Sequence, residues 1–404
     1  MDGQKPPRTA SRGHDESVSI AENVVANLGR PRWSDGPLTI RGIETIPIRV
    51  PLKKTYRGSA YQMTHRSTIL TRLLTDQGIV GEAYVGDEDG ALGTIIGIIH
   101  DEIEPVLLGQ DAFCVERCWS LSRPATYDIL RDRRHGLVAT ACIDTAIWDA
   151  VGKALRQPLW RLWGGFTNEL PTISIGGYYA DDADIEAEIA FLRELGVAGL
   201  KFKVGGLSPE EDAKRFRRAR SAAGPDFVLA ADANQGWSPT EAIQFARLVS
   251  DLDLYWFEEP CHWSNDRRAM RDVRYSSGAR ICAGQSEFSA AGCRDLMVEG
   301  AVDVCNFDAS WSGGPTEWRR AAAIASAFDV EMAHHEEPQV ASHLLASIPH
   351  GAFVEFFHPD RDPIWWNLVE NREPLVDGRM RLTEAPGLGW VLDAAYIDRY
   401  RIDK

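Results

Sequence analysis

The stretch GLKFKVGGLSPEEDAKRFRRARSAAGPDFVLAADAN, residues 199–234, holds the repeating unit that decides the fold. Its β-rich runs Gly199–Lys203 and Val228–Ala231 predict two strands, and Pro209–Ala222 between them predicts a helix. Two strands connected through a helix lie parallel in one sheet, because antiparallel neighbours can be joined by a short turn. The stretch therefore predicts a βαβ unit of an α/β fold.

The same alternation continues on both sides of this unit, from about residue 170 onward. A repeat of roughly 20–30 residues is typical of a TIM-like barrel. A doubly wound open sheet is the alternative, but no Gly-rich dinucleotide fingerprint follows the first strand. Strands are expected near Ile173–Ile175, Gly199–Lys203, Val228–Ala231, Tyr255–Glu258, Arg280–Ala283, Val302–Cys305, Val330–Ala333 and Phe353–Glu355, and helices include Ala183–Leu195, Pro209–Ala222, Pro239–Asp251 and Pro315–Phe328.

The sequence before the barrel lacks this regular alternation of strands and helices. Residues 37–165 predict an α+β capping domain, with a hairpin around Asp76-Gln77-Gly78 and helical spacing later. The segment KKTYRGSAYQMTHR, residues 53–66, is polar and contains glycine, so a loop is expected there. We expect residues 1–36 to form a disordered tail with a short helix at 17–27, residues 166–385 the barrel, and residues 386–404 a return to the capping domain.

Composition excludes several classes of protein. A net charge of -15 disfavours a nucleic-acid partner, and no run of eighteen apolar residues exists that could cross a membrane. Seven scattered cysteines favour reduced thiols and a cytoplasmic location over a disulfide framework. Cys114 and Cys118 have no second Cys/His pair nearby, so no zinc site is expected.

Polar residues end successive predicted strands, where the active site of such a barrel lies. Side chains alternate along a strand, so Lys201 and Lys203 share a face, and each cation is expected to depress the pKa of the other. A lysine that is neutral near pH 7 can act as a base. In chain order the strand-end residues are Lys201, Lys203, Asp232, Asn234, Glu258, Gln285 or Glu287, Asp308, His335 and Glu355.

Two smaller groups stand out among these strand ends. Oxygen ligands on neighbouring strands, such as Asp232 and Glu258, suit Mg²⁺. Of the neighbours His334 and His335 at most one points inward, and an inward Asp308 can hold an imidazole and raise its basicity. We expect His334 to be structural.

The motif set resembles the mandelate racemase subgroup of the enolase superfamily. Asp308 lies five residues before Gly313-Gly314, His335 lies eight before His343, and Glu355 lies twelve after His343. The resemblance covers nearly all of residues 37–395 and implies a (β/α)7β barrel with an α+β capping domain. It also implies one Mg²⁺ per active site, a small-molecule carboxylate substrate and a homo-oligomer.

The resemblance further implies a role for each strand-end residue. The proton α to a carboxylate is removed, and the ion stabilises the resulting enediolate. The implied assignments are a base at Lys203, charge stabilisation by Lys201, metal ligands at Asp232 and Glu258, a His335–Asp308 dyad, a substrate-carboxylate contact at Glu355 and a substrate contact at Asn234.

One position departs from the family pattern. The third metal ligand is normally Glu, Asp or Asn, and here that position is Gln285. Gln can ligate through its amide oxygen, with one less negative charge. Glu287 points to the same side of the strand but lies roughly 6–7 Å further along. We therefore expect Gln285, rather than Glu287, to complete the metal site.

Three functions are compatible with these residues. We favour dehydration of a sugar acid, an aldonate or aldarate, to a 2-keto-3-deoxy acid. The basis is the polar 53–66 segment, which offers Lys53, Lys54, Tyr56, Arg57, Tyr61 and His65. Racemisation or epimerisation of a 2-hydroxy acid would use Lys203 and His335 on opposite faces. A non-catalytic sugar-acid-binding protein is the third alternative, and Gln285 is its sequence support.

Overall fold

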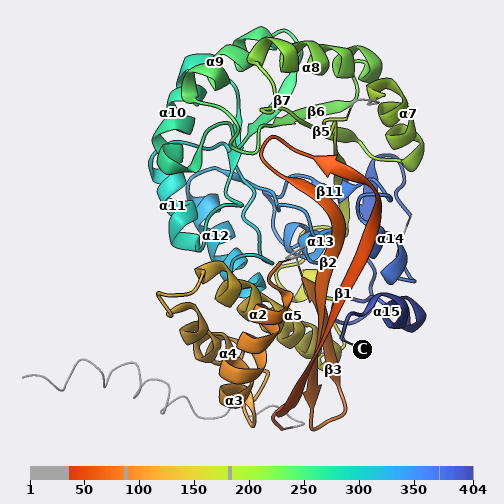
Figure 1. Cartoon of the computed structure of the whole chain (residues 1–404). Coiled ribbons are helices and arrows are strands. Elements are labelled where there is room, and N and C mark those ends of the chain that lie inside the picture. The colour runs from red at the N-terminus through yellow and green to blue at the C-terminus, as the bar shows by residue number, and fades with distance from the viewer. Residues whose placement is uncertain (1–35, 86–89, 181–183, 373, 404) are drawn as a thin grey trace, which may run out of the picture. The chain divides into compact units, whose positions relative to one another are not determined.

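The structure is a computed structural model that describes residues 36–85, 90–180, 184–372 and 374–403. The expected helix at 17–27 lies outside these residues. Leu38–Lys404 form one compact unit, shown in Figure 1, to which the following description applies.

An antiparallel sheet of three strands begins this unit, in the order β1-β2-β3. The strands are β1 (Ile40–Arg57), β2 (Gln62–Thr75) and β3 (Val80–Val85), and the hairpin between β2 and β3 confirms the predicted one. The helical elements that follow are α2 (Leu92–Ile98), a π-helical turn (Ile99–Ile103), α3 (Glu104–Leu107), α4 (Val115–Ser122), a 3-10 turn (Arg123–Thr126), α5 (Arg133–Ala154) and α6 (Leu159–Leu162).

The predicted loop at residues 53–66 is wrong in most of its length. β1 continues to Arg57 and β2 begins at Gln62, with Tyr56 paired with Met63. The pairing is irregular between Pro51 and Tyr56, which matches the polar composition without abolishing the strands. The loop prediction from polar composition was wrong because pairing with the neighbouring strand and burial of the Tyr56 ring stabilise strand structure in these polar residues.

Eight parallel strands form the barrel, in the spatial order β10-β9-β8-β7-β6-β5-β4-β11. A bridge between Met332 and Gly351, just before β11, brings the two ends of this order together. The structure therefore confirms the predicted α/β barrel. The strands are β4 (Glu169–Gly176), β5 (Gly199–Lys203), β6 (Val228–Asp232), β7 (Leu254–Glu258), β8 (Ile281–Ala283), β9 (Val304–Cys305), β10 (Glu331–Met332) and β11 (Val354–Phe357), and β12 (Arg379–Arg381) pairs antiparallel with β4.

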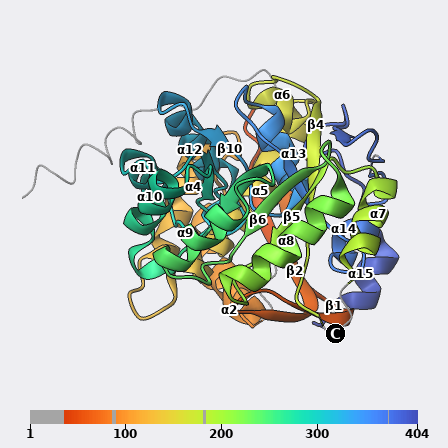
Figure 2. The same ribbon diagram turned by 90° about the horizontal axis from the view of Figure 1, so that it is seen from above.

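Helices follow the strands around the outside of the barrel, as Figures 1 and 2 show for α7 to α12. Phe202 of β5 contacts Phe216 of α8, so this side of the strand faces the helices as predicted. The lysines on either side of Phe202 consequently face the interior. The helices are α7 (Ile185–Leu195), α8 (Pro209–Ala223), α9 (Pro239–Leu248), a 3-10 turn (Trp263–Asn265), α10 (Asp266–Ser277), α11 (Ala290–Val298), α12 (Pro315–Ala327), α13 (Pro338–Ala346), α14 (Pro363–Leu368) and α15 (Ala394–Tyr400).

Helix α5 is attached to the barrel through a buried aspartate. Asp144 accepts hydrogen bonds from the backbone N and the Oγ1 of Thr316, both at 2.8 Å. Gly314 passes close beside it with φ +91°, where an added Cβ would lie 2.5 Å from Asp144 Oδ2. A glycine is therefore required where α5 meets the start of α12.

The C-terminal segment lies against β1. The backbone N of Ile402 donates to the carbonyl of Pro47 at 3.0 Å, and Arg401 forms an isolated bridge with Ile48. Among the described residues, no helix is both long enough and apolar enough to span a membrane.

Candidate active site

The predicted polar residues gather at the carboxyl ends of the barrel strands. Lys203 on β5 is in register with Asp232 on β6, which is in register with Glu258 on β7. Parallel strands place such residues side by side at one end of the sheet. Eight of the predicted residues are buried, with exposures of at most 8%: Lys201, Lys203, Asp232, Glu258, Gln285, Asp308, His335 and Glu355.

The two lysines are paired with carboxylates. Lys203 Nζ lies 2.6 Å from Asp232 Oδ2, whereas Lys201 Nζ lies 2.6 Å from Glu258 Oε1 and 2.5 Å from Glu355 Oε1. Burial alone would lower the pKa of each lysine, but the neighbouring carboxylates outweigh it and raise both pKa values above their usual range. Lys201 does lower the pKa of Lys203, as expected, but its repulsion is smaller than the attraction to the acids. The expected net depression of the lysine pKa values is therefore wrong for this structure.

The oxygen donors at this site fit a magnesium ion. Burial raises the pKa of Glu258 to about 8, whereas Lys203 and Lys201 outweigh burial at Asp232 and lower its pKa. A divalent cation would offset the cost of burying both carboxylates. Within the described part of the chain no group of three His, Cys, Asp or Glu side chains is placed to hold a metal, so Asp232 and Glu258 would need a further oxygen donor of another kind.

The Gln285 amide is hydrogen-bonded to Asn306, whereas the carboxylate of Glu287 is held by Arg267. Gln285 Oε1 accepts from Asn306 Nδ2 at 3.2 Å, and the backbone N of Gln285 donates to Asn306 Oδ1 at 3.2 Å. Both carboxylate oxygens of Glu287 instead accept from Arg267 Nη2, at 2.6 and 2.7 Å. Glu287 would have to break this ion pair to reach the site. Gln285 as third ligand stays a prediction.

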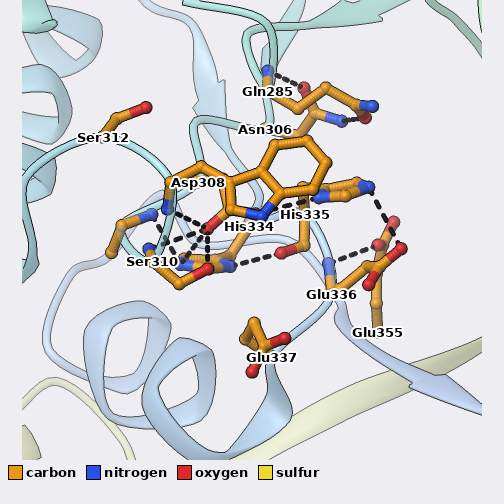
Figure 3. Close-up of polar contacts among 12 residues, drawn as sticks. Gln285, Asn306, Asp308, Ser310, Ser312, His334, His335, Glu336, Glu337 and Glu355 are labelled. Atoms are coloured by element: carbon orange, nitrogen blue, oxygen red, sulfur yellow. Dashed lines mark hydrogen bonds and ion pairs between the residues drawn. The ribbon is translucent and has the colours of Figure 1, made fainter. Parts of the chain in front are cut away.

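His335 and Asp308 form the expected dyad, which Figure 3 shows. His335 Nδ1 lies 2.9 Å from Asp308 Oδ2. The other oxygen, Asp308 Oδ1, accepts from the backbone N and hydroxyl of Ser310, at 2.8 and 2.6 Å. These bonds fix the carboxylate, and the ring of Trp311 lies 4.8 Å from the His335 ring. Nδ1 is occupied by Asp308, so a reactant could be reached only by Nε2, which also lies 3.3 Å from Glu336 Oε1.

His334 has the structural role that the sequence predicts. Its Nε2 accepts from the backbone N of Ala309 at 3.0 Å, and its Nδ1 donates to the carbonyl of His335 at 2.8 Å. Burial lowers the pKa of His334, in keeping with a neutral imidazole that accepts at one nitrogen and donates at the other.

The 53–66 segment contributes less to the mouth of the barrel than expected. Lys53 is exposed and pairs with Asp360 at 2.6 Å. The turn of the hairpin does reach the site, since Ser59 Oγ donates to the carbonyl of Asn234 at 3.3 Å. The Tyr61 ring lies 5.7 Å from Lys203 Nζ. Of the predicted loop residues, Tyr61 is thus the one placed beside a strand-end lysine.

Three residues near the site were not predicted from the sequence. Tyr178, just after β4, has a buried hydroxyl without a hydrogen-bond partner in the described part of the chain, and its ring lies 6.0 Å from Lys203 Nζ. Glu336, after β10, lies 3.3 Å from His335, and Arg66 of β2 lies 3.5 Å from Glu336. A polar residue directly after the first barrel strand was the available signal for Tyr178, whereas Arg66 depends on how the hairpin is placed.

Two protein-family models match this chain, one over its N-terminal part and the other over the barrel. The model of the mandelate racemase / muconate lactonizing enzyme N-terminal domain matches residues 42–164, and that of the enolase C-terminal domain-like family matches residues 184–396. Curated relatives include 3,6-anhydro-alpha-L-galactonate cycloisomerase of Streptomyces coelicolor, 28% identical over 90% of this chain and 99% of that protein. Another is arabinonate dehydratase of Saccharolobus solfataricus, 26% identical over 82% of this chain and 90% of that protein.

The solved structures point the same way. A mandelate racemase/muconate lactonizing enzyme from a marine actinobacterium, crystallised in complex with magnesium, is 58% identical. It superposes with a TM-score of 0.87 and covers 91% of this chain and all of its own.

Proposed function

We propose that this chain, which belongs to the mandelate racemase / muconate lactonizing enzyme family of the enolase superfamily, dehydrates a sugar acid to a 2-keto-3-deoxy acid. The family consists of enzymes that include acid-sugar dehydratases and racemases, as the relatives illustrate. The choice among these reactions is our inference from the residues at the barrel mouth.

Each step is assigned to residues of this chain. Lys203 removes the proton α to the substrate carboxylate, and His335 Nε2 gives a proton to the departing β-hydroxyl. Lys201 and Glu355, paired at 2.5 Å, orient the carboxylate. Asp232, Glu258 and Gln285 would hold Mg²⁺, which when bound supplies positive charge to the buried acids and to the developing dianion.

Placement of the two proton-transfer residues supports the proposal. β5 carries Lys203 and β10 precedes His335, with β11 and β4 between them on one side of the ring and β6 to β9 on the other. The two side chains therefore approach a substrate from different sides of the barrel mouth. Such an arrangement allows one group to take a proton while the other gives one.

Hydroxyl groups near the barrel mouth are the reason for proposing a sugar acid as the substrate. The Ser59 hydroxyl contacts the carbonyl of Asn234, and the rings of Tyr61 and Tyr178 lie 5.7 and 6.0 Å from Lys203 Nζ. The Tyr178 hydroxyl is buried without a partner among the described residues. A buried hydroxyl without a partner is costly unless a ligand or water satisfies it. The additional hydroxyls of a polyhydroxylated acid can do so, whereas the ring of an aromatic acid cannot.

The test is a library of aldonic and aldaric acids incubated with the enzyme and Mg²⁺, with 2-keto acid formation as the readout. We expect turnover of at least one acid, lost in Lys203→Ala and in His335→Asn. Inversion at the α-carbon without keto acid would favour the racemase alternative, for which the two proton-transfer residues are equally suited. Absence of any turnover across the library would refute the dehydratase assignment.

A non-catalytic binding protein is distinguished by isotope exchange. An enzyme of either kind should exchange the α-proton of a bound sugar acid with D₂O, because exchange requires only proton removal and return. A binding protein should bind the acid without exchange, and without dependence on Lys203 or His335.

A further inference from the structure

Glu336 lies against the nitrogen of His335 that faces the reactant. Glu336 Oε1 is 3.3 Å from His335 Nε2, while Asp308 Oδ2 is 2.9 Å from Nδ1. The imidazole is thus bracketed by two carboxylates, one at each nitrogen, as Figure 3 shows. A neutral imidazole has one N–H and can donate to one of them, whereas an imidazolium donates to both.

The backbone and a cation hold Glu336 in this place. Glu336 and Glu337 have φ values of +51° and +48°, in the left-handed region that non-glycine residues rarely adopt. The backbone N of Glu336 donates to Glu355 Oε2 at 2.9 Å, and its carboxylate Oε2 lies 3.5 Å from Arg66 Nη1. Strained backbone of this kind persists where surrounding contacts over-determine it, often at a working site.

We propose that Glu336 keeps His335 as the imidazolium in the resting enzyme, so that His335 enters the reaction as the acid. The second half of this statement rests on the dehydration proposed above, and the first half does not. Glu336 contacts His335 rather than the reacting atoms, so it is a positioning residue.

The other charged groups around the ring do not supply this effect. Lys201 on β5 opposes a positive charge on His335, and buried His334, whose own pKa is lowered, adds no positive charge. Burial lowers the pKa of His335, yet the carboxylates of Glu336 and Asp308 together raise it to about 9, with Glu336 contributing more than Asp308 through charge. Among the described residues, Glu336 also has charged neighbours in Arg66 of β2, Glu337 immediately before α13 and Glu355 of β11.

The proton balance of the dehydration follows from this assignment. Its ion pair with Asp232 favours the ammonium form of Lys203, so Lys203 must first release a proton to solvent. The α-C–H bond then breaks and its proton passes to the Lys203 amine, which becomes an ammonium again. The Nε2–H bond of His335 breaks as the β-C–O bond breaks, and the hydroxyl leaves as water with the bonding electron pair. Glu336 remains a carboxylate throughout, and a proton returned from Lys203 to His335 through solvent resets both groups. His335 is therefore already protonated when the reaction begins. A suitable substrate places its departing hydroxyl on the side of the site where His335 lies.

An NMR titration of the full chain with Mg²⁺ present tests the resting protonation state without any substrate. Histidine is selectively isotope-labelled, and the His335 signal is identified by its loss in His335→Asn. We expect a His335 pKa well above 6.5 in the wild type and at least a tenfold drop in proton affinity in Glu336→Gln. Glu336→Asp, which keeps the charge, should restore most of the affinity. Glu331→Gln is the matched control, because its carboxylate pairs with Arg280 instead.

Two results would overturn the inference. One is a wild-type His335 that is neutral at pH 7, and the other is a Glu336→Gln variant that titrates as the wild type does. Neither result depends on the library assay, so failure of the dehydratase assignment remains distinguishable from failure of this one. If keto acid forms, Glu336→Gln should also move the alkaline limb of the kcat/KM profile to lower pH, which loss of packing alone would not do.

Discussion

Acidification should destabilise this protein through His343, which is buried between three segments of the chain. His343 Nδ1 accepts from the backbone N of Trp160 at 3.2 Å, and Nε2 donates to the carbonyl of Leu388 at 3.1 Å. A proton on Nδ1 would remove the first of these bonds and place a charge in a buried position. Burial accordingly lowers the pKa of His343 from its ordinary 6.5 to about 4.

The magnitude follows from linkage. The unfolded chain binds a proton at His343 below pH 6.5, whereas the folded chain does not until about pH 4. Stability is therefore fully present above 6.5 and is lost as pH falls through this window. The whole window corresponds to roughly 3 kcal/mol, and the step from pH 7 to pH 5 to about 2 kcal/mol.

Urea unfolding at pH 7 and pH 5, for the wild type and His343→Gln, isolates this contribution. The variant should be less stable than the wild type at pH 7, because it loses a well-placed side chain. Between the two pH values it should lose about 2 kcal/mol less than the wild type, since glutamine does not titrate. His262→Gln, at an exposed position, should follow the wild type. Equal pH dependence in the wild type and His343→Gln would refute the reasoning.

Two further predictions concern the metal site and the attachment of α5. Gln285→Glu should keep or tighten Mg²⁺ binding measured by calorimetry, and Gln285→Leu should weaken it, because the first adds a charged donor and the second removes the donor. Unchanged affinity in Gln285→Leu together with loss in Glu287→Gln would transfer the ligand role to Glu287. Gly314→Ala should destabilise the fold by roughly 2–4 kcal/mol, through left-handed strain and overlap with Asp144. Gly278→Ala has similar strain, φ +75°, but open space around the new Cβ, so about 1 kcal/mol is expected there. Equal losses in these two variants would show that the Asp144 overlap contributes nothing.

Local pattern was enough to predict the barrel and the position of its chemistry. Strand residues alternate between two faces, and parallel strands present their carboxyl ends together, so polar residues at strand ends must meet. Asp232, Glu258 and His335 could therefore be placed at one mouth from their spacing in the chain. The predicted helices and strands needed only the change in hydrophobic period to be found.

Contacts between distant segments decided the rest. The charge state of Lys201 depends on Glu355, which another strand brings within 2.5 Å, so the sequence argument from neighbouring lysines had the wrong sign. Arg267 withdraws Glu287 from the metal site, and no spacing rule predicts that ion pair.

Sequence and tertiary structure also determine different properties of the His335 imidazole. Sequence by itself determined that one of two adjacent histidines faces inward next to Asp308, because a strand has a period of two. The tertiary structure alone decided that a left-handed turn places Glu336 on Nε2 of that histidine, with Arg66 from the first sheet beside it. A backbone turn of this kind is set by the contacts that surround it, and those contacts exist only once the capping sheet lies over the barrel.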